Sequence, residues 1–244
     1  MHALFIALSL LCGTAALAQE LPADLHRLPE PAGLARLVRP ADRQAPPLVI
    51  LLPDALGEDG RSEPYVDSLL SRGIATLVLG LGEGQDGAVA ATEPAAAPGA
   101  VAPALAWAAD HGFPPAHVGV MGFGLGGRAA LAAAAHAAVA LYPRCRGLDA
   151  KPGRALVLQG AMAAEDCDAH ALPEGVVLHS VPGAFHGWDT PGAIWPTPGP
   201  MVPDPAGGPR LRAVADLAAT LAAAESVADW FEEILIGHAQ RAGR

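Results

Sequence analysis

Gly122-Phe123-Gly124-Leu125-Gly126-Gly127 is preceded by Val118-Gly119-Val120-Met121 and followed by Arg128-Ala129-Ala130-Leu131. The apolar run before the glycines predicts a buried strand, and the alanine-rich run after them predicts a helix. The glycines between the two mark a sharp turn. A strand that turns directly into a helix is the first half of a βαβ unit, so this stretch predicts an α/β protein.

The same alternation of strand and helix extends in both directions from this stretch. Strands that alternate with helices form parallel units, so the sequence predicts an α/β fold with a single doubly wound, mostly parallel sheet flanked by helices. Irregular loops are expected at 80–99 and 190–209, which are rich in Gly and Pro. The predicted strands are 48–52, 74–79, 117–121, 137–141, 155–158 and 176–181, and the predicted helices are 65–72, 100–111, 126–136 and 211–238.

The first 18 residues have the pattern of a secretory signal peptide. An apolar run from Leu4 to Cys12 is followed by Ala16-Leu17-Ala18, a small-residue cleavage site. The run is too short to span a bilayer. We therefore expect cleavage after Ala18 and a periplasmic or secreted protein, the alternative being a buried N-terminal helix.

The rest of the chain is expected to be a single folded unit. Residues 19–46 are rich in Pro and charge and predict an extended lead-in, and 47–240 predict the α/β domain. A chain of 244 residues is long enough for one such domain. The formal net charge of −10 argues against nucleic acid and anionic membranes as partners.

Three segments resemble the dienelactone hydrolase family of the α/β-hydrolases. The resemblance extends over about residues 45–235 and implies action on an ester, lactone or other acyl substrate. It also implies the chain order nucleophile, acid, histidine. The segments are Pro53-Asp54-Ala55-Leu56-Gly57-Glu58-Asp59-Gly60-Arg61-Ser62 with Tyr65, then Val120–Gly127, and finally Val181-Pro182-Gly183-Ala184-Phe185-His186-Gly187-Trp188-Asp189.

The resemblance places three catalytic positions, and two of them carry unusual residues. Gly124 stands where the family has its Ser or Cys nucleophile, and Ala163 stands where it has its Asp. His186 matches the family histidine. Asp166, in the same loop as Ala163, is a candidate substitute acid; the alternative is a solvated acidic loop.

Other residues are predicted around these positions. The backbone N–H of Leu125, with one from Asp54 or Ala55, is expected to form an oxyanion hole. Arg61 and Arg128 are candidates for binding a substrate carboxylate, or else they tie loops together. Glu83 is a pocket residue or a solvated one, and Trp188 belongs to the pocket wall or to the core.

The cysteines and histidines give further expectations. Export leaves Cys145 and Cys167, which predict either a disulfide or two free thiols. The histidines show no metal-ligand spacing, and the glycines match neither a P-loop nor a dinucleotide fingerprint. We therefore expect no metal and no cofactor.

Three functions are compatible with these residues. In the first, the protein is a catalytically impaired or inactive hydrolase relative that retains a small-molecule pocket. In the second, it hydrolyses an ester, lactone or other acyl substrate with His186 together with an activated water or a rearranged acid. In the third, it is a non-catalytic interaction module that presents the loop at 190–209.

Overall fold

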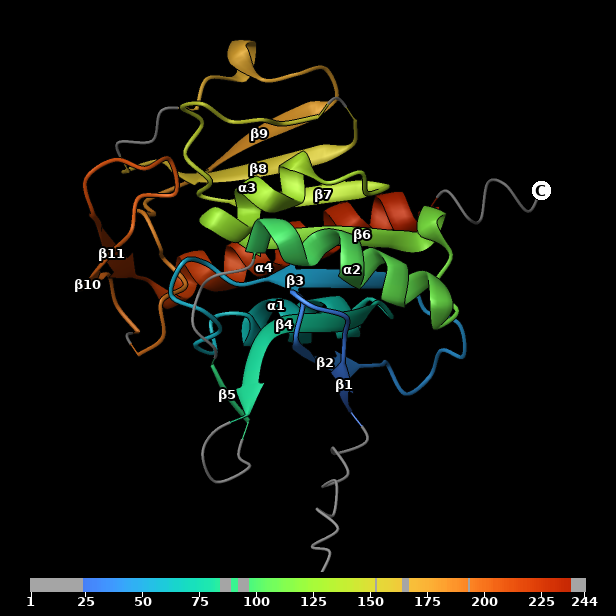
Figure 1. Ribbon diagram of the computed structural model, residues 1–244. Coiled ribbons are helices and arrows are strands. Elements are labelled where there is room, and N and C mark those ends of the chain that lie inside the picture. The colour runs from blue at the N-terminus through green and yellow to red at the C-terminus, as the bar shows by residue number, and fades with distance from the viewer. Residues whose placement is uncertain are drawn as a thin grey trace, which may run out of the picture.

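The computed structural model describes residues 24–83, 89–91, 97–151, 153–163, 167–192 and 194–237. Within them, nine strands form one sheet in the order β1-β2-β4-β3-β6-β7-β8-β9, and β5 pairs with β4 (Figure 1). The strands from β4 to β9 along this order run parallel, whereas β1, β2 and β5 pair antiparallel. The strands are β1 (Leu25–Arg27), β2 (Leu34–Val38), β3 (Leu48–Leu52), β4 (Ala75–Glu83), β5 (Val89–Ala91), β6 (Val118–Phe123), β7 (Ala137–Leu141), β8 (Ala155–Gly160) and β9 (Val176–Val181).

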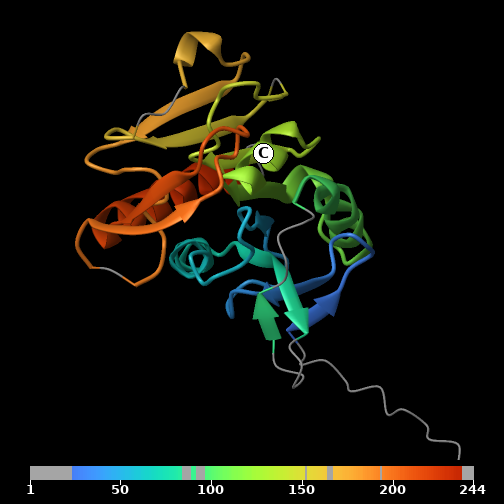
Figure 2. The ribbon, with the colours of Figure 1, turned by 60° about the vertical axis from the view of Figure 1, so that its left-hand side comes forward.

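Helices cover both faces of this sheet, which confirms the predicted doubly wound fold (Figure 2). Along β3, Val49 and Leu51 pack into the core under α1 and α4. Leu48, Ile50 and Leu52 point to the other face, into the core under α2 and α3. Successive strand residues point to opposite faces, so a strand buried on both sides is apolar throughout. The helices are α1 (Glu63–Ser71), α2 (Ala97–Asp110), α3 (Leu125–Ala132) and α4 (Leu217–Phe231), which continues into a π-helix (Glu232–Ile236).

The segment 19–46 differs from the expected lead-in. Its described part forms β1 and β2. These two strands make one edge of the sheet, because β1 pairs with β2 and β2 pairs with β4. Leu34 and Ala35 of β2 are buried. These runs are short and lie between prolines, so their local pattern does not distinguish a strand from an extended loop.

The C-terminal third also differs from the prediction. A β-hairpin of β10 (Thr197–Val202) and β11 (Leu211–Ala215) occupies much of the segment expected to be a loop and the first turns expected to be helix. Backbone N–H groups of Val214 and Asp216 donate to the carbonyls of His186 and Trp188 at 3.0 and 2.7 Å. The hairpin is therefore fixed against the loop that follows β9.

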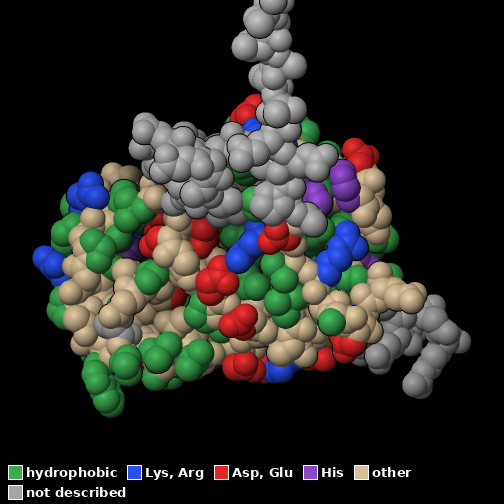
Figure 3. All heavy atoms as spheres, turned by 90° about the horizontal axis from the view of Figure 1, so that it is seen from below, with side chains coloured by type: hydrophobic (Ala, Val, Ile, Leu, Met, Phe, Trp, Pro, Cys, Tyr) green, Lys and Arg blue, Asp and Glu red, His purple; other side chains and the backbone are tan. Residues whose placement is uncertain are grey.

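The surface is mixed in charge on the face seen in Figure 3. Acidic, basic and hydrophobic side chains are interspersed there. A contiguous basic surface of the kind that binds nucleic acid does not cover this face. In the part of the chain that the structure describes, no helix has the length and apolar character to cross a membrane.

Candidate active site

Gly124 forms the sharp turn between β6 and α3. Its φ of 49° and ψ of −109° lie in a region that residues with a side chain adopt only under strain. Its N–H donates to the carbonyl of Leu141 at 3.0 Å, and its own carbonyl accepts from the N–H of Arg128 at 3.1 Å. The turn is thus held in a strained form, which glycine adopts without steric cost.

Two neighbouring glycines explain why helix and strand approach so closely here. A Cβ on Gly122 would lie 2.3 Å from the backbone carbon of Gly126. A Cβ on Gly126 would lie 2.2 Å from the carbonyl oxygen of Pro53. The start of α3 is therefore pressed against β6 and against the loop after β3, which brings Asp54 and Ala55 beside the turn.

Three side chains surround the place where a nucleophile's Cβ would stand on Gly124. The Cγ of Pro205 is 3.3 Å from that point, the Cβ of Asp54 is 3.6 Å away, and Cε2 of Tyr142 is 3.9 Å away. These three residues come from the β10–β11 hairpin, the loop after β3 and the end of β7. They define the walls of the candidate site.

His186 lies beside the same walls. It follows β9, is buried, and its ring meets the ring of Tyr142 edge-on with centroids 4.9 Å apart. Because Tyr142 contacts both positions, the structure places His186 and Gly124 at the same carboxyl edge of the sheet. This is the edge at which ligands bind in open α/β sheets.

Ala163 follows β8 in a loop that runs alongside the histidine loop. The N–H of Met162 donates to the carbonyl of Ala184 at 2.9 Å. A Cβ on Gly160 would lie 2.6 Å from the same carbonyl oxygen. The predicted acid position therefore lies next to the histidine loop, and the alanine there has no carboxyl group. The candidate substitute, Asp166, lies outside the described residues.

The predicted oxyanion-hole residues gather at this edge. Leu125 is the first residue of α3, where the helix leaves backbone N–H groups without intrahelical acceptors. Asp54 was expected to contribute only its backbone, but its carboxylate is buried beside the turn. Its Oδ1 accepts the N–H of Leu56 at 2.6 Å. A buried carboxylate here disfavours a developing oxyanion, because like charges repel.

Arg61 does not serve as a substrate-binding residue. Its guanidinium donates to Asp59 through Nε at 2.8 Å and through NH2 at 2.6 Å. NH1 donates to Oδ2 of Asp54 at 2.5 Å, within a side chain that is only 2% exposed. Burial raises the pKa of Asp54, although the nearby Arg61 charge opposes that shift. Arg61 ties the loop after β3 together, which was the alternative interpretation.

Arg128 also ties a loop. Its guanidinium donates to the carbonyls of Pro143 at 3.2 Å, Arg144 at 2.5 Å, Arg146 at 3.3 Å and Gly147 at 2.6 Å. These four acceptors occupy both terminal nitrogens. These bonds agree with the alternative interpretation, in which Arg128 ties the loop after β7.

Trp188 and Glu83 were both candidates for the pocket, and the structure describes only the side chain of Trp188. Trp188 is fully buried in the core, which agrees with the second of its two predicted places, the core and not the pocket wall. Its Nε1 donates to the hydroxyl of Tyr65 at 3.2 Å. Glu83 is the last residue of β4, and its side chain lies outside what the structure describes.

The sequence predictions do not include Asp189, a buried acid three residues after His186. Asp189 accepts a hydrogen bond from Tyr142 at Oδ1, 2.6 Å, and from Tyr65 at Oδ2, 2.9 Å. The hydroxyl of Tyr142 in turn accepts from NH1 of Arg61 at 3.3 Å. Burial raises the pKa of Asp189 to about 6. Its place three residues after His186 was the signal that could have identified it.

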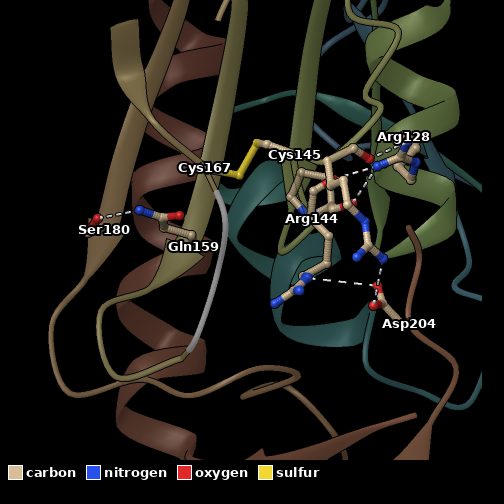
Figure 4. Close-up of a disulfide and its surroundings, with 9 residues drawn as sticks. Arg128, Arg144, Cys145, Gln159, Cys167, Ser180 and Asp204 are labelled. Atoms are coloured by element: carbon tan, nitrogen blue, oxygen red, sulfur yellow. Dashed lines mark hydrogen bonds and ion pairs between the residues drawn. A yellow bond between two sulfur atoms is a disulfide. The ribbon is translucent and has the colours of Figure 1, made fainter. Parts of the chain in front are cut away.

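Cys145 and Cys167 form a disulfide, with Cα atoms 4.8 Å apart (Figure 4). The bond joins the loop after β7 to the loop after β8. Both loops border the candidate site, so the disulfide fixes one of its walls. Within the described residues, His, Cys, Asp and Glu side chains form no group of three suited to a metal ion.

No family model matches this chain, and no curated protein matches it. Several solved structures, in contrast, are similar to this chain. A dienelactone hydrolase-like promiscuous phosphotriesterase from metagenomic libraries is 16% identical with a TM-score of 0.55, covering 82% of this chain and 92% of its own. The esterase domain of a Rhodothermus marinus protein is 14% identical with a TM-score of 0.54, covering 83% and 93%.

An α/β serine hydrolase without a lid, from Xanthomonas campestris, is 17% identical with a TM-score of 0.51 and covers 68% of this chain and 87% of its own. Identities this low report on the fold. The structural similarity agrees with the strand order of the sheet. It also agrees with the turn at Gly124, which matches the strand–turn–helix on which α/β-hydrolases carry their nucleophile. The chain therefore has the α/β-hydrolase fold.

Proposed function

We propose that this protein is an exported, dienelactone hydrolase-like protein that binds a small acyl or carboxyl compound without hydrolysing it through a covalent intermediate. The observation that carries the proposal is the turn at Gly124. It keeps the strained backbone of a nucleophile elbow while offering no attacking atom. Covalent acyl transfer needs an oxygen or sulfur at that point.

The surrounding residues support the same conclusion. Ala163 provides no carboxylate to orient His186, and loss of that orientation alone costs about 10⁴ in rate in the known serine triad. What a site without its triad retains is binding and oxyanion contacts, about 10³–10⁴ over water. The disulfide between Cys145 and Cys167 accords with export to an oxidising compartment.

A second candidate function is hydrolysis by a water that His186 activates. The observation that favours it is the position of His186, which is buried against Tyr142, whose Cε2 lies 3.9 Å from the Cβ position of Gly124. A water occupies about 30 Å³ of liquid volume and needs polar partners. Asp54, whose Cβ lies 3.6 Å from the Gly124 Cβ position, provides one nearby carboxylate.

Turnover of p-nitrophenyl acetate distinguishes these functions. We expect the wild-type protein to hydrolyse it no faster than His186→Ala does. Gly124→Ser combined with Ala163→Asp is expected to raise the rate by about 10²-fold or more, because it restores nucleophile and acid. The single variant Gly124→Ser should stay well below the double variant, since the acid governs the histidine tautomer.

A fluorophosphonate probe provides an independent measurement, because it reacts covalently with an activated serine. We expect it to label Gly124→Ser/Ala163→Asp and not the wild-type chain. If the wild-type protein turns over the ester and His186→Ala abolishes that turnover, the non-hydrolytic proposal is wrong and the water-activation alternative replaces it.

A further inference from the structure

A groove lies at the opposite edge of the sheet from Gly124. Its volume is about 570 Å³, within the range of about 300–1,000 Å³ that is usual for small-molecule sites. The groove is bordered by the end of α2, by the segment that leads into β6 and by the residues that follow α3. Val118, which lines it, is the first residue of β6, whereas Gly124 follows the last, so about 17 Å of strand separates the two places. The groove is therefore distinct from the candidate active site.

The larger side chains that line the groove are apolar and fixed. Phe113 and Val118 are 3% and 2% exposed, and Leu105 packs against the same core. The guanidinium of Arg39 lies over the ring of Phe113, 5.0 Å from its centroid, and helps to hold that ring in place. Preformed apolar walls of this kind favour a ligand with an apolar body.

The smaller side chains of the groove are alanines. An alanine extends no further than its Cβ atom, so a wall of alanines is nearly flat. A planar ring can contact such a wall over its whole face, and a rigid ring loses less conformational freedom on binding than a flexible chain does. The wall therefore favours an aromatic body. These alanines are Ala106, Ala116, Ala134 and Ala135.

The charged group beside the groove is the guanidinium of Arg154. His136 lines the groove, and NH1 of Arg154 donates to Nε2 of His136 at 3.1 Å. A guanidinium has five N–H donors, so this bond positions the group and a carboxylate can still accept from a pair of the others. Among the residues that the structure describes, Arg154 forms no ion pair with a carboxylate, and its side chain is exposed. The groove thus has a cation at its rim and apolar walls within.

We propose that this groove binds a small aromatic carboxylate. The ring of the ligand lies between Phe113 and the alanines, and its carboxylate accepts from Arg154. The planar fork of a guanidinium matches a carboxylate with two parallel N–H···O bonds, which gives the ligand one orientation. This site is additional to the binding role proposed for the turn at Gly124 and does not depend on it.

A titration with 2-naphthoate tests the proposal, with the backbone amide resonances of the isotope-labelled protein as the readout. We expect saturable shifts at Leu105, at Phe113 and at Ala134–His136. The expected Kd is about 0.1–1 mM, the order of affinity that so small a ligand reaches. The amides of Gly124 and Leu125 should not follow the same binding curve.

The role of the charge is tested with the neutral amide of the same ring, 2-naphthamide. We expect it to bind about 5-fold more weakly than 2-naphthoate, the effect of a partly exposed ion pair. Arg154→Gln should weaken 2-naphthoate by the same factor and leave 2-naphthamide unchanged. Arg72→Gln is the matched control. It removes the same charge from the end of α1, on the other face of the sheet, and should leave both affinities unchanged.

The position of the site is tested with Ala134→Asp, which places a carboxylate in the groove. This variant should abolish the shifts that 2-naphthoate causes at Leu105 and Phe113, because like charges repel. Ala222→Asp, on α4, is the matched control and should bind as the wild-type protein does. Both alanines are exposed, so neither change disturbs the core. Octanoate, which has a flexible chain in place of the ring, should bind more weakly than 2-naphthoate.

Several results would overturn the proposal. These are shifts that do not saturate, equal affinities for 2-naphthoate and 2-naphthamide, equal affinities of Arg154→Gln and Arg72→Gln, or tighter binding of octanoate. Shifts confined to Gly124 and its neighbours would also overturn it, while supporting the binding role proposed for that turn. Ester turnover by the wild-type protein would refute the non-hydrolytic function and leave the result for the groove standing.

Discussion

At the scale of single residues, the site combines the backbone of a sharp strand-to-helix turn with a glycine at its centre. Gly124 keeps the conformation of a nucleophile turn, and His186 keeps its place beside it. Asp189, in contrast, supports the site from below through the hydroxyls of Tyr65 and Tyr142. Asp189 is thus a buried carboxyl group that accepts from two phenol hydroxyls.

The raised pKa of Asp189, about 6, predicts how stability depends on pH. Between its ordinary value near 4 and about 6, only the folded protein keeps the proton, so the free energy of unfolding falls as pH rises through this range. We expect the wild-type protein to lose about 3 kcal/mol relative to Asp189→Asn across that window. Urea unfolding at about pH 4 and about pH 7 measures the difference.

The matched control for this measurement is Asp67→Asn, which removes an exposed carboxyl group from α1. Its stability should follow the wild-type pH dependence. If Asp189→Asn also runs parallel to the wild-type protein between the two pH values, Asp189 does not hold a proton in the folded state.

At the scale of elements, the close contact between α3 and two strands determines the shape of the site. Gly122 and Gly126 allow the helix to start directly on β6 and against the loop after β3. This places the first N–H groups of α3 and the loop containing Asp54 around the same point. Positions 122 and 126 therefore require glycine for packing, whichever residue stands at position 124.

Gly122→Ala tests this packing. The added Cβ would lie 2.3 Å from the backbone of Gly126, and backbone cannot swing aside as a side chain does. We expect a loss of about 3 kcal/mol or more in the free energy of unfolding, measured by urea titration. Gly199→Ala in β10 is the control; its nearest neighbour is 3.4 Å away, and it should cost less than about 1 kcal/mol. Equal losses in both variants would contradict this account.

At the scale of the whole molecule, long-range links fasten the loops to the sheet. The disulfide joins the loops after β7 and β8, and the hairpin bonds to the histidine loop. The strands that border the site belong to the parallel part of the sheet, whose carboxyl ends all lie at one edge. Residues in the loops at that edge can therefore be substituted without disturbing the strand pairing of the sheet.

Removal of the disulfide by Cys145→Ser/Cys167→Ser is expected to lower the free energy of unfolding by about 3 kcal/mol. The bond closes a loop with a sequence separation of 22 residues, and chain-entropy arguments give this magnitude. Urea unfolding of the double variant, and of the wild-type protein with a reductant, should give the same decrease. No change in midpoint in either experiment would show that the bond adds nothing to stability.

Local patterns were sufficient for much of the fold. Strands β3 and β7 match their predicted ranges because each is a continuous apolar run. Strand β9 also matches its predicted range, because it lies between Gly175 and Pro182. The hairpin β10–β11 was missed because Pro198 and Pro200 interrupt the strand pattern. Its pairing becomes visible only through contacts with residues far away in sequence.

The sequence by itself determined the alternation of strands and helices from β3 to β9, the sharp turn at Gly124, and the absence of Ser, Cys or Asp from the two predicted catalytic positions. These properties depend on side-chain periodicity and residue identity, which are local. The tertiary structure alone decided that Pro205 lies against Gly124, that Asp189 accepts from Tyr65 and Tyr142, and that Arg61 and Arg128 tie loops. Those outcomes depend on which distant segments meet, and hydrophobic burial fixes that only when the whole chain is folded.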